Sequence, residues 1–135
     1  MNTKLNVLVI DDDAVVGRSF DRVLSDKGYN VVTALSGEEG LDTLARERGR
    51  FDVMLVDYAM PGLNGLEVAA RARRQNFDAP ILMITGYAEL GEPSADGSEP
   101  AEPDARLISA TLRKPFSLRE LEITLIRLLS VPANV

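Results

Sequence analysis

The sequence contains no cysteine and no histidine among its 135 residues. Without cysteine, the chain forms no disulfide and offers no thiolate to a metal ion, a composition that fits the reducing cytoplasm. Without histidine, it has no imidazole for acid–base catalysis or for zinc binding. It also has no apolar run long enough to span a bilayer and no basic, apolar leader. These absences predict a cytoplasmic protein that does not enter a membrane.

Positive charge is scarce as well. The 15 Lys and Arg residues face 21 Asp and Glu residues, which gives a formal net charge of −6. Because such a chain would be repelled by phosphates, we expect no direct binding to nucleic acid. The arginines within 46–50 and 71–74 are interpreted as solvated helix ends and faces.

What the chain does have is a regular alternation of two patterns. Short apolar runs predict strands at residues 5–10, 30–34, 53–56, 81–84 and 107–113. Between and after them, apolar residues recur at helical spacing. Ser36 with Glu39 indicates a capping box, Ser117 with Glu120 a further helix start, and Gly28 a helix stop. This alternation predicts a doubly wound α/β fold, in which a parallel sheet is covered by helices on both faces.

Polar residues follow the predicted strands. Asp11 and Asp12 follow the first strand, Asp57 the third, Thr85 the fourth and Lys114 the fifth. Each has an ordinary explanation when taken alone, and Asp13 is read as a simple helix N-cap. Together they place three carboxylates, one hydroxyl and one ammonium at the carboxyl edge of the sheet, where parallel sheets form ligand sites.

Clustered carboxylates repel one another and need a cation to be tolerated. Three carboxylate oxygens suit Mg²⁺, with Mn²⁺ as a substitute, and Mg²⁺ commonly binds beside a phosphate. The sequence has neither a GxxxxGK[ST] loop nor a GxGxxG loop for a nucleotide. We therefore expect the phosphoryl group on the protein itself, with Asp57 as its acceptor because aspartate can act as a nucleophile.

Four segments carry a family resemblance: VLVIDDD, DVMLVDYAMPGLNG, PILMIT and LRKPF. In this order they resemble the receiver domain of bacterial two-component response regulators, over roughly residues 4–130 of a single domain spanning 1–135. The resemblance implies a (βα)5 fold of the flavodoxin and chemotaxis-receiver type, with strand order 2-1-3-4-5.

The resemblance also implies roles and partners. Asp57 would receive a phosphoryl group from a histidine kinase or phosphotransfer protein. Asp11, Asp12, Asp57 and the backbone carbonyl of Ala59 would bind Mg²⁺. Lys114 would contact the phosphoryl group, Thr85 would move toward it, and the bond from Lys114 to Pro115 would be cis. The resemblance implies no enzyme beyond the domain's own phosphoryl transfer and autodephosphorylation, and the downstream target is unknown.

Two features depart from the family pattern. The switch position, often aromatic in relatives, is Thr111. Twenty-eight residues separate Thr85 from Lys114, and within them residues 88–105 carry six acids, three prolines and no base. We expect the fourth helix to be short or disordered, residues 89–104 to be mobile, and the protein to be a monomer or weak dimer.

Two residues are expected to set the lifetime of an aspartyl phosphate. By the resemblance, Ala59 and Tyr87 flank the approach of hydrolytic water. Ala59 offers no polar group to orient that water, while the Tyr87 ring is large enough to exclude it. We therefore expect slow hydrolysis of the phosphate. We also expect Tyr87 to supply the moving aromatic ring that relatives often carry at the position of Thr111.

Three other functions were considered. A phosphohydrolase with an aspartate nucleophile would carry a second Asp at position 59, which is Ala. A flavodoxin-like FMN binder would need a loop rich in hydroxyls and glycine after the first strand, where three acids stand. A receiver that docks without phosphorylation would have lost a site residue, and all five are present. We therefore expect a phosphoaccepting, single-domain regulator.

Overall fold

The computed structural model describes residues 4–86 and 106–130 of the chain. Its centre is one parallel sheet in the order β2-β1-β3-β4-β5, as predicted. The strands are β1 (Asn6–Ile10), β2 (Asn30–Ala34), β3 (Val53–Asp57), β4 (Ile81–Thr85) and β5 (Ala110–Arg113). The order reverses between β1 and β3, which makes the carboxyl edge there the expected place for a site.

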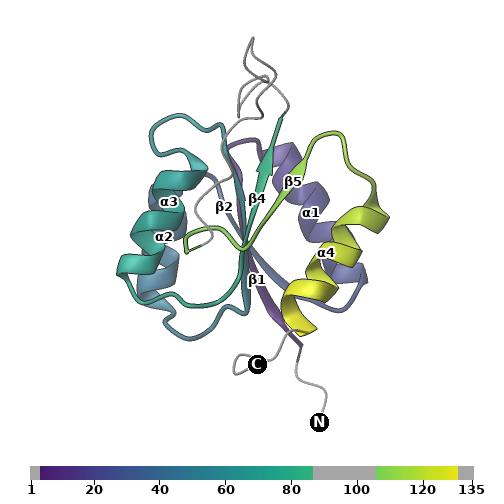
Figure 1. Cartoon of the computed structure of the whole chain (residues 1–135), viewed down its shortest axis with the longest axis horizontal. Coiled ribbons are helices and arrows are strands. Elements are labelled where there is room, and N and C mark those ends of the chain that lie inside the picture. Colours follow the sequence, from purple (N-terminus) through teal and green to yellow (C-terminus); the bar gives the residue numbers. More distant parts are fainter. Residues whose placement is uncertain (1–3, 87–105, 131–135) are drawn as a thin grey trace, which may run out of the picture.

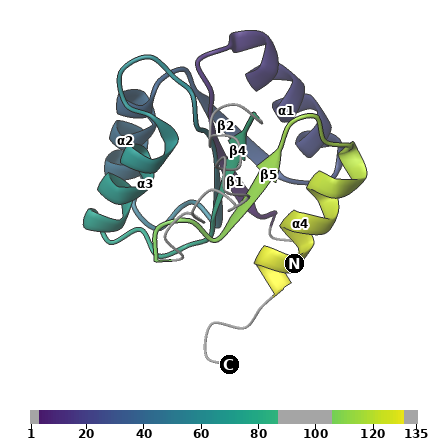
Figure 2. The same ribbon diagram turned by 45° about the horizontal axis from the view of Figure 1, so that its top comes forward.

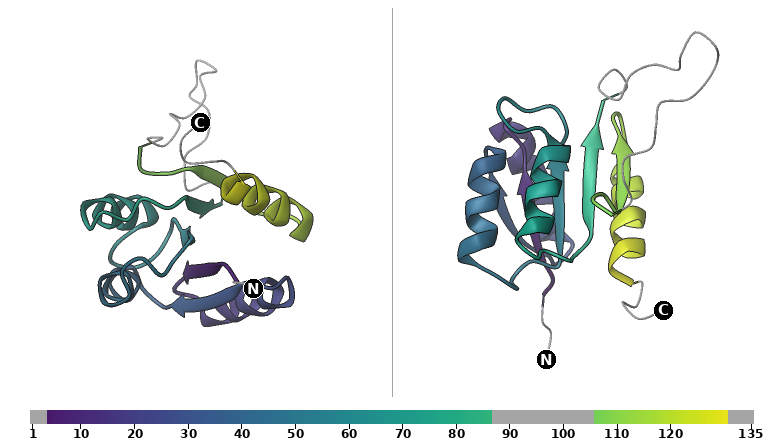
Figure 3. Two further views of the ribbon diagram at one scale, coloured as in Figure 1. Left: turned by 90° about the horizontal axis from the view of Figure 1, so that it is seen from below. Right: turned by 60° about the vertical axis from the view of Figure 1, so that its left-hand side comes forward.

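Helices cover both faces of this sheet. The described helices are α1 (Ala14–Asp26), α2 (Gly37–Arg46), α3 (Gly65–Arg74) and α4 (Leu118–Ser130). Figure 1 shows α2 and α3 on one side of the sheet and α1 and α4 on the other. The same separation is visible from the directions of Figure 2 and Figure 3. The predicted doubly wound α/β fold is therefore confirmed.

The core consists of two layers that follow the period of two along each strand. In β3, Val53 and Leu55 pack toward α1 and α4, whereas Met54 and Val56 pack toward α2 and α3. All four side chains are at most 1% exposed. A strand buried on both faces needs a continuous apolar sequence, which explains the uninterrupted run before Asp57.

Helix starts were predicted well but not completely. Asp13 caps α1, accepting hydrogen bonds from the amides of Val15 and Val16. Ser36 caps α2 by accepting from Glu39, but the Glu39 carboxylate accepts from the amide of Leu35. The capping box predicted there is thus incomplete, because the carboxylate reaches one residue beyond the extended Ser36.

The complete capping box in the structure lies at α3 and was not predicted. The Asn64 side chain accepts from the Glu67 amide, and the Glu67 carboxylate accepts from the Asn64 amide, both at 2.9 Å. The spacing of Asn and Glu by three residues was the available signal.

The fifth strand is shorter than predicted. It begins at Ala110 rather than at Leu107. Instead of extending the strand, the Leu107 carbonyl oxygen accepts a hydrogen bond from Arg73, and the Ser109 hydroxyl oxygen accepts one from the Ile81 amide. These side-chain bonds hold the approach to β5. The predictions of a short fourth helix and of mobility at 89–104 lie outside the described residues.

Gly65 allows the chain to enter α3 beside the end of β3. A Cβ atom at this position would lie 2.9 Å from the carbonyl oxygen of Asp57 and 3.0 Å from the Cα of Tyr58. The Gly65 amide donates to the Tyr58 carbonyl oxygen at 2.9 Å. Because the obstructing atoms are backbone, they cannot move aside cheaply, which explains the glycine after Asn64.

Replacing Gly65 with Ala is expected to destabilise the protein by about 1–3 kcal/mol, the usual cost of overpacking. Urea unfolding followed by circular dichroism measures the change. Gly17→Ala, in α1, is the matched control. Its new Cβ would make only an ordinary contact, 3.9 Å from the Cγ2 atom of Thr33. That control should be neutral or stabilising by about 0.5–1 kcal/mol. Equal stability of the Gly65→Ala protein and the wild type would contradict the close-approach explanation.

Candidate functional site

Four strands bring their ends to the proposed site. Asp57 is the last residue of β3 and Thr85 the last of β4, while Asp11 follows β1 and Lys114 follows β5. The strand alternation that points Val53 and Leu55 toward α1 and α4 also applies to Asp57. The sheet therefore fixes the directions of these side chains before any ligand is present.

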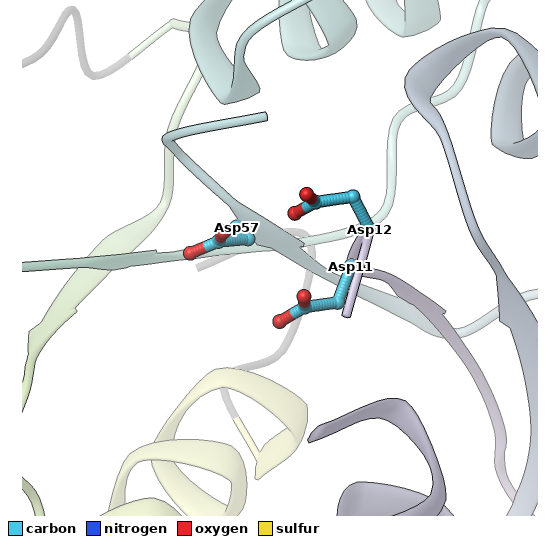
Figure 4. Close-up of side chains that lie close together, drawn as sticks. All are labelled: Asp11, Asp12 and Asp57. Carbon is cyan, nitrogen blue, oxygen red and sulfur yellow. The ribbon is translucent and has the colours of Figure 1, made fainter. Parts of the chain in front are cut away.

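Asp11, Asp12 and Asp57 form a compact acidic group. One carboxylate oxygen from each lies within 4.8 Å of the other two, and Figure 4 shows the three side chains next to one another. Asp11 is 4% exposed and Asp57 is 6% exposed, whereas Asp12 is open to solvent. Two desolvated carboxylates and one solvated carboxylate supply the hard oxygen ligands that suit Mg²⁺ and leave one side open for water. The residues present fit this cation.

Asp11 is held by the backbone around it. Its amide donates to the Ala34 carbonyl oxygen at 3.1 Å, and its Oδ1 accepts from the Asp13 amide at 2.9 Å. Burial raises the pKa of the Asp11 carboxyl above its ordinary value. The Asp13 hydrogen bond and the charge of Lys114 oppose this increase in pKa, while the charges of Asp12 and Asp13 add to it.

Lys114 brings positive charge to the acidic group. Its Nζ lies 3.2 Å from Oδ1 of Asp57, and its side chain is partly exposed. Its backbone amide donates to the Thr85 carbonyl oxygen at 2.7 Å, which fixes the end of β5 against the end of β4. The bond from Lys114 to Pro115 is cis, as the family resemblance implied.

Thr85 is fully buried at the end of β4. Its hydroxyl donates to the carbonyl oxygen of Gly86 at 3.0 Å. A movement of Thr85 toward a group on Asp57 would therefore exchange this bond for another.

Of the remaining candidate residues, the structure describes Ala59 and Thr111 but not Tyr87. Ala59 lies two residues after Asp57 and is exposed. Thr111 is half-buried in β5, where it is paired with Met83 of β4. Tyr87, the candidate for shielding and switching, lies outside the described residues.

One arginine was misjudged from the sequence. Arg73 was read as part of a solvated helix face, but it is partly buried and donates to the carbonyl oxygens of Phe77, Ala79 and Leu107. No local pattern signals this role, because one of the acceptors lies 34 residues away along the chain.

Comparison with known proteins agrees with this geometry. The family model of the response regulator receiver domain matches residues 7–125. The chain therefore belongs to the response regulator receiver family, a class of two-component signalling domains. Receiver domains are generally non-enzymatic signalling modules, and an acidic cluster such as the one described above is typical of their Mg²⁺ site.

Individual relatives show the same relationship. The chain is 39% identical over 117 residues to the response regulator MprA of Mycolicibacterium vanbaalenii, with 87% of this chain and 47% of the relative aligned. Among solved structures, the chemotaxis protein CheY4 of Vibrio cholerae is 32% identical with a TM-score of 0.77, covering 94% of this chain and 100% of that one.

A third similar protein is the response regulator TrrA of Thermotoga maritima, whose structure was solved in complex with Mg²⁺ and BeF. It is 30% identical with a TM-score of 0.74, and the match covers 93% of this chain and 99% of that one. The chain spans about half the length of the curated relatives it matches. Across residues 4–86 and 106–130, no helix has the length and apolarity needed to cross a membrane.

Asp11→Asn should raise the thermal midpoint of the protein by a few degrees at neutral pH in the presence of a chelator. The pKa of Asp11 is raised on folding, so the folded state binds more protons than the unfolded state. The contribution of Asp11 to the free energy of unfolding therefore decreases as the pH rises through its pKa. Asn removes that loss and keeps the oxygen that accepts from Asp13. The difference should shrink as the pH falls toward the ordinary value of 3.8.

Added Mg²⁺ should stabilise the wild type and have little effect on Asp11→Asn, because one ligand is lost. Thermal unfolding with and without Mg²⁺ measures both effects. Asp42→Asn, which removes a charge from an exposed position on α2, should respond to Mg²⁺ as the wild type does. A chelated Asp11→Asn protein that melts below the wild type at neutral pH would contradict the burial argument.

Proposed function

We propose that Asp57 accepts a phosphoryl group from a phosphohistidine on a histidine kinase or phosphotransfer protein, and that the modified domain signals to a downstream protein. The observation that carries this proposal is the Lys114 ammonium 3.2 Å from the buried Asp57 carboxylate, beside Asp11 and Asp12. A buried carboxylate that served packing alone would not need two further carboxylates against it.

The donor histidine lies outside residues 1–135, because these contain no histidine. A carboxylate oxygen of Asp57 attacks the phosphorus, and a new O–P bond forms as the P–N bond of the phosphohistidine breaks. The electron pair of the broken bond stays on the imidazole nitrogen of the donor. The opposite carboxylate oxygen remains available for other contacts in the site.

The residues around Asp57 have separate tasks. Lys114 pairs with the Asp57 carboxylate before transfer. After transfer, its ammonium can pair with a negatively charged phosphoryl oxygen. Asp11, Asp12, Asp57 and the carbonyl of Ala59 would hold Mg²⁺ or Mn²⁺, which would supply positive charge against the phosphoryl oxygens. Thr85 gives up its bond to Gly86 and donates to another phosphoryl oxygen.

The conformational signal would start from this exchange at Thr85. The change would remove the hydrogen bond from the Thr85 hydroxyl to the Gly86 carbonyl oxygen at the carboxyl end of β4. Thr111, on the neighbouring strand, has no aromatic ring to follow Thr85. We therefore assign the moving ring to Tyr87, which directly follows Gly86 in the sequence.

Asp57→Asn should abolish stable phosphorylation, because an amide is not a comparable nucleophile. The chain is incubated with acetyl phosphate and Mg²⁺, and intact mass spectrometry measures the phosphorylated fraction. A chelator should abolish the mass gain of the wild type, and Asp42→Asn should retain it. Persistent labelling of Asp57→Asn at another residue would refute the acceptor assignment. A wild type that gains no mass under these conditions would favour a docking module that works without phosphorylation.

Tyr87→Ala should shorten the lifetime of the phosphorylated protein severalfold, because a smaller side chain admits water to the phosphoryl group. Ala59→Asn should shorten it more modestly by orienting a water molecule. The decay is followed by intact mass in Mg²⁺ buffer after removal of the phosphodonor. Decay of Tyr87→Ala at the wild-type rate would show that the ring does not shield the site. Unchanged phosphorylation-dependent amide shifts in the same variant would remove its switch role.

A further inference from the structure

Arg73 donates to three backbone carbonyl oxygens at the amino edge of the sheet. One guanidinium nitrogen, Nη1, donates to the carbonyl oxygens of Phe77 at 2.8 Å and Ala79 at 2.7 Å. The other, Nη2, donates to the carbonyl oxygen of Leu107 at 3.1 Å. The side chain thereby connects the end of α3, the approach to β4 and the approach to β5.

This contact depends on the shape of the guanidinium. Its planar fork presents several donors in fixed directions, whereas a lysine ammonium is a compact charge on a flexible stem. Arg73 Cζ also lies 5.8 Å from the centre of the Phe77 ring. Burial lowers the pKa of Arg73 from its ordinary value, partly offset by the charge of Asp78, so the contact is made at some cost in solvation.

The approach to β5 is fixed by two further bonds. The Ser109 amide donates to the Ile81 carbonyl oxygen at 2.9 Å, and the Ser109 hydroxyl oxygen accepts from the Ile81 amide at 3.0 Å. β5 itself has four residues, and among the described strands it pairs with β4 alone. A short edge strand makes few ladder hydrogen bonds of its own, so contacts that fix its start help to define its register.

The register of β5 decides where Lys114 lies. Thr85 is paired with Arg113, and Lys114 is the next residue along the chain. A shift of one residue would turn Leu112 out of the core. A shift of two residues would keep the faces but move Lys114 by about 7 Å, at ~3.3 Å per residue. Either shift would separate its Nζ from Asp57 Oδ1.

We propose that Arg73 is a positioning residue for the phosphoryl site, which holds β5 in the register that brings Lys114 to Asp57. It does so from the opposite edge of the sheet, through the Leu107 carbonyl and the strand that follows. This inference rests on the proposed function, because its effect is expected on the binding of a phosphoryl-like group.

The test compares two affinities in the full chain. Beryllium fluoride in the presence of Mg²⁺ is the probe for the phosphoryl position, and Mg²⁺ alone is the probe for the acidic group. Arg73→Met should weaken beryllium fluoride binding severalfold, because the affinity falls in proportion to the fraction of molecules in which β5 keeps the observed register. Mg²⁺ affinity should not fall, since its ligands lie at the ends of β1 and β3 and displacement of Lys114 removes a competing cation from Asp57.

Milder variants and a matched control accompany this change. Arg73→Lys and Ser109→Ala should weaken beryllium fluoride binding in the same direction by smaller factors, and both keep most of the local packing. Arg74→Met removes the neighbouring, exposed arginine and should bind both probes as the wild type does. Thermal midpoints are recorded for every variant, so that a general loss of stability is seen separately.

Combination with Lys114→Gln tests whether Arg73 acts through Lys114. In that background, Arg73→Met should cause no further loss of beryllium fluoride affinity. An equal loss with and without Lys114, or a parallel loss of Mg²⁺ affinity, would overturn the positioning role and leave a structural one. Unchanged beryllium fluoride binding by Arg73→Met would overturn it as well. A wild type that binds no beryllium fluoride would instead refute the proposed function, and this inference with it.

Discussion

The structure depends on keeping two carboxylates out of water without neutralising them completely. Asp11 and Asp57 are almost fully buried beside each other and beside Asp12. Burial of an ionised group costs several kcal/mol unless other charges and hydrogen bonds compensate. Here the compensation comes from the Asp13 amide and from the Lys114 ammonium. Lys114 is partly exposed, and the clustered carboxylates also suit a hard divalent cation.

The parallel sheet makes this arrangement possible. β3 and β4 are apolar until their last residue, which is polar and lies at the carboxyl end of the strand. Helices lie on both faces of the sheet, as Figure 1 shows, and β3 and β4 are buried throughout. The amino edge of the same sheet carries no comparable set of carboxylates among the described residues. It is used instead for anchoring, through Arg73 and Ser109. Chemistry and anchoring thus lie at opposite ends of the same strands.

The sequence was sufficient to predict the alternation of strands and helices, the strand order and the residues at the strand ends. The alternation and the residues at the strand ends follow from apolar periodicity and from local caps such as Asp13, which act over a few residues. The strand order was implied by the family resemblance. The true start of β5, the actual partner of Glu39 and the buried contacts of Arg73 could not be predicted in the same way. Each depends on a backbone group presented by the tertiary fold, and the Leu107 carbonyl reaches Arg73 only after the chain has returned to the sheet.

The negative and positive charges of the site come from different parts of the sequence. Its three carboxylates lie within the first 57 residues, on segments that follow or end β1 and β3. Its ammonium belongs to residue 114, after the last strand. During synthesis from the amino terminus, the acidic half of the site therefore leaves the ribosome well before its own counter-charge. Until Lys114 has emerged, the acidic half of the site lacks the ammonium that pairs with Asp57 in the folded protein.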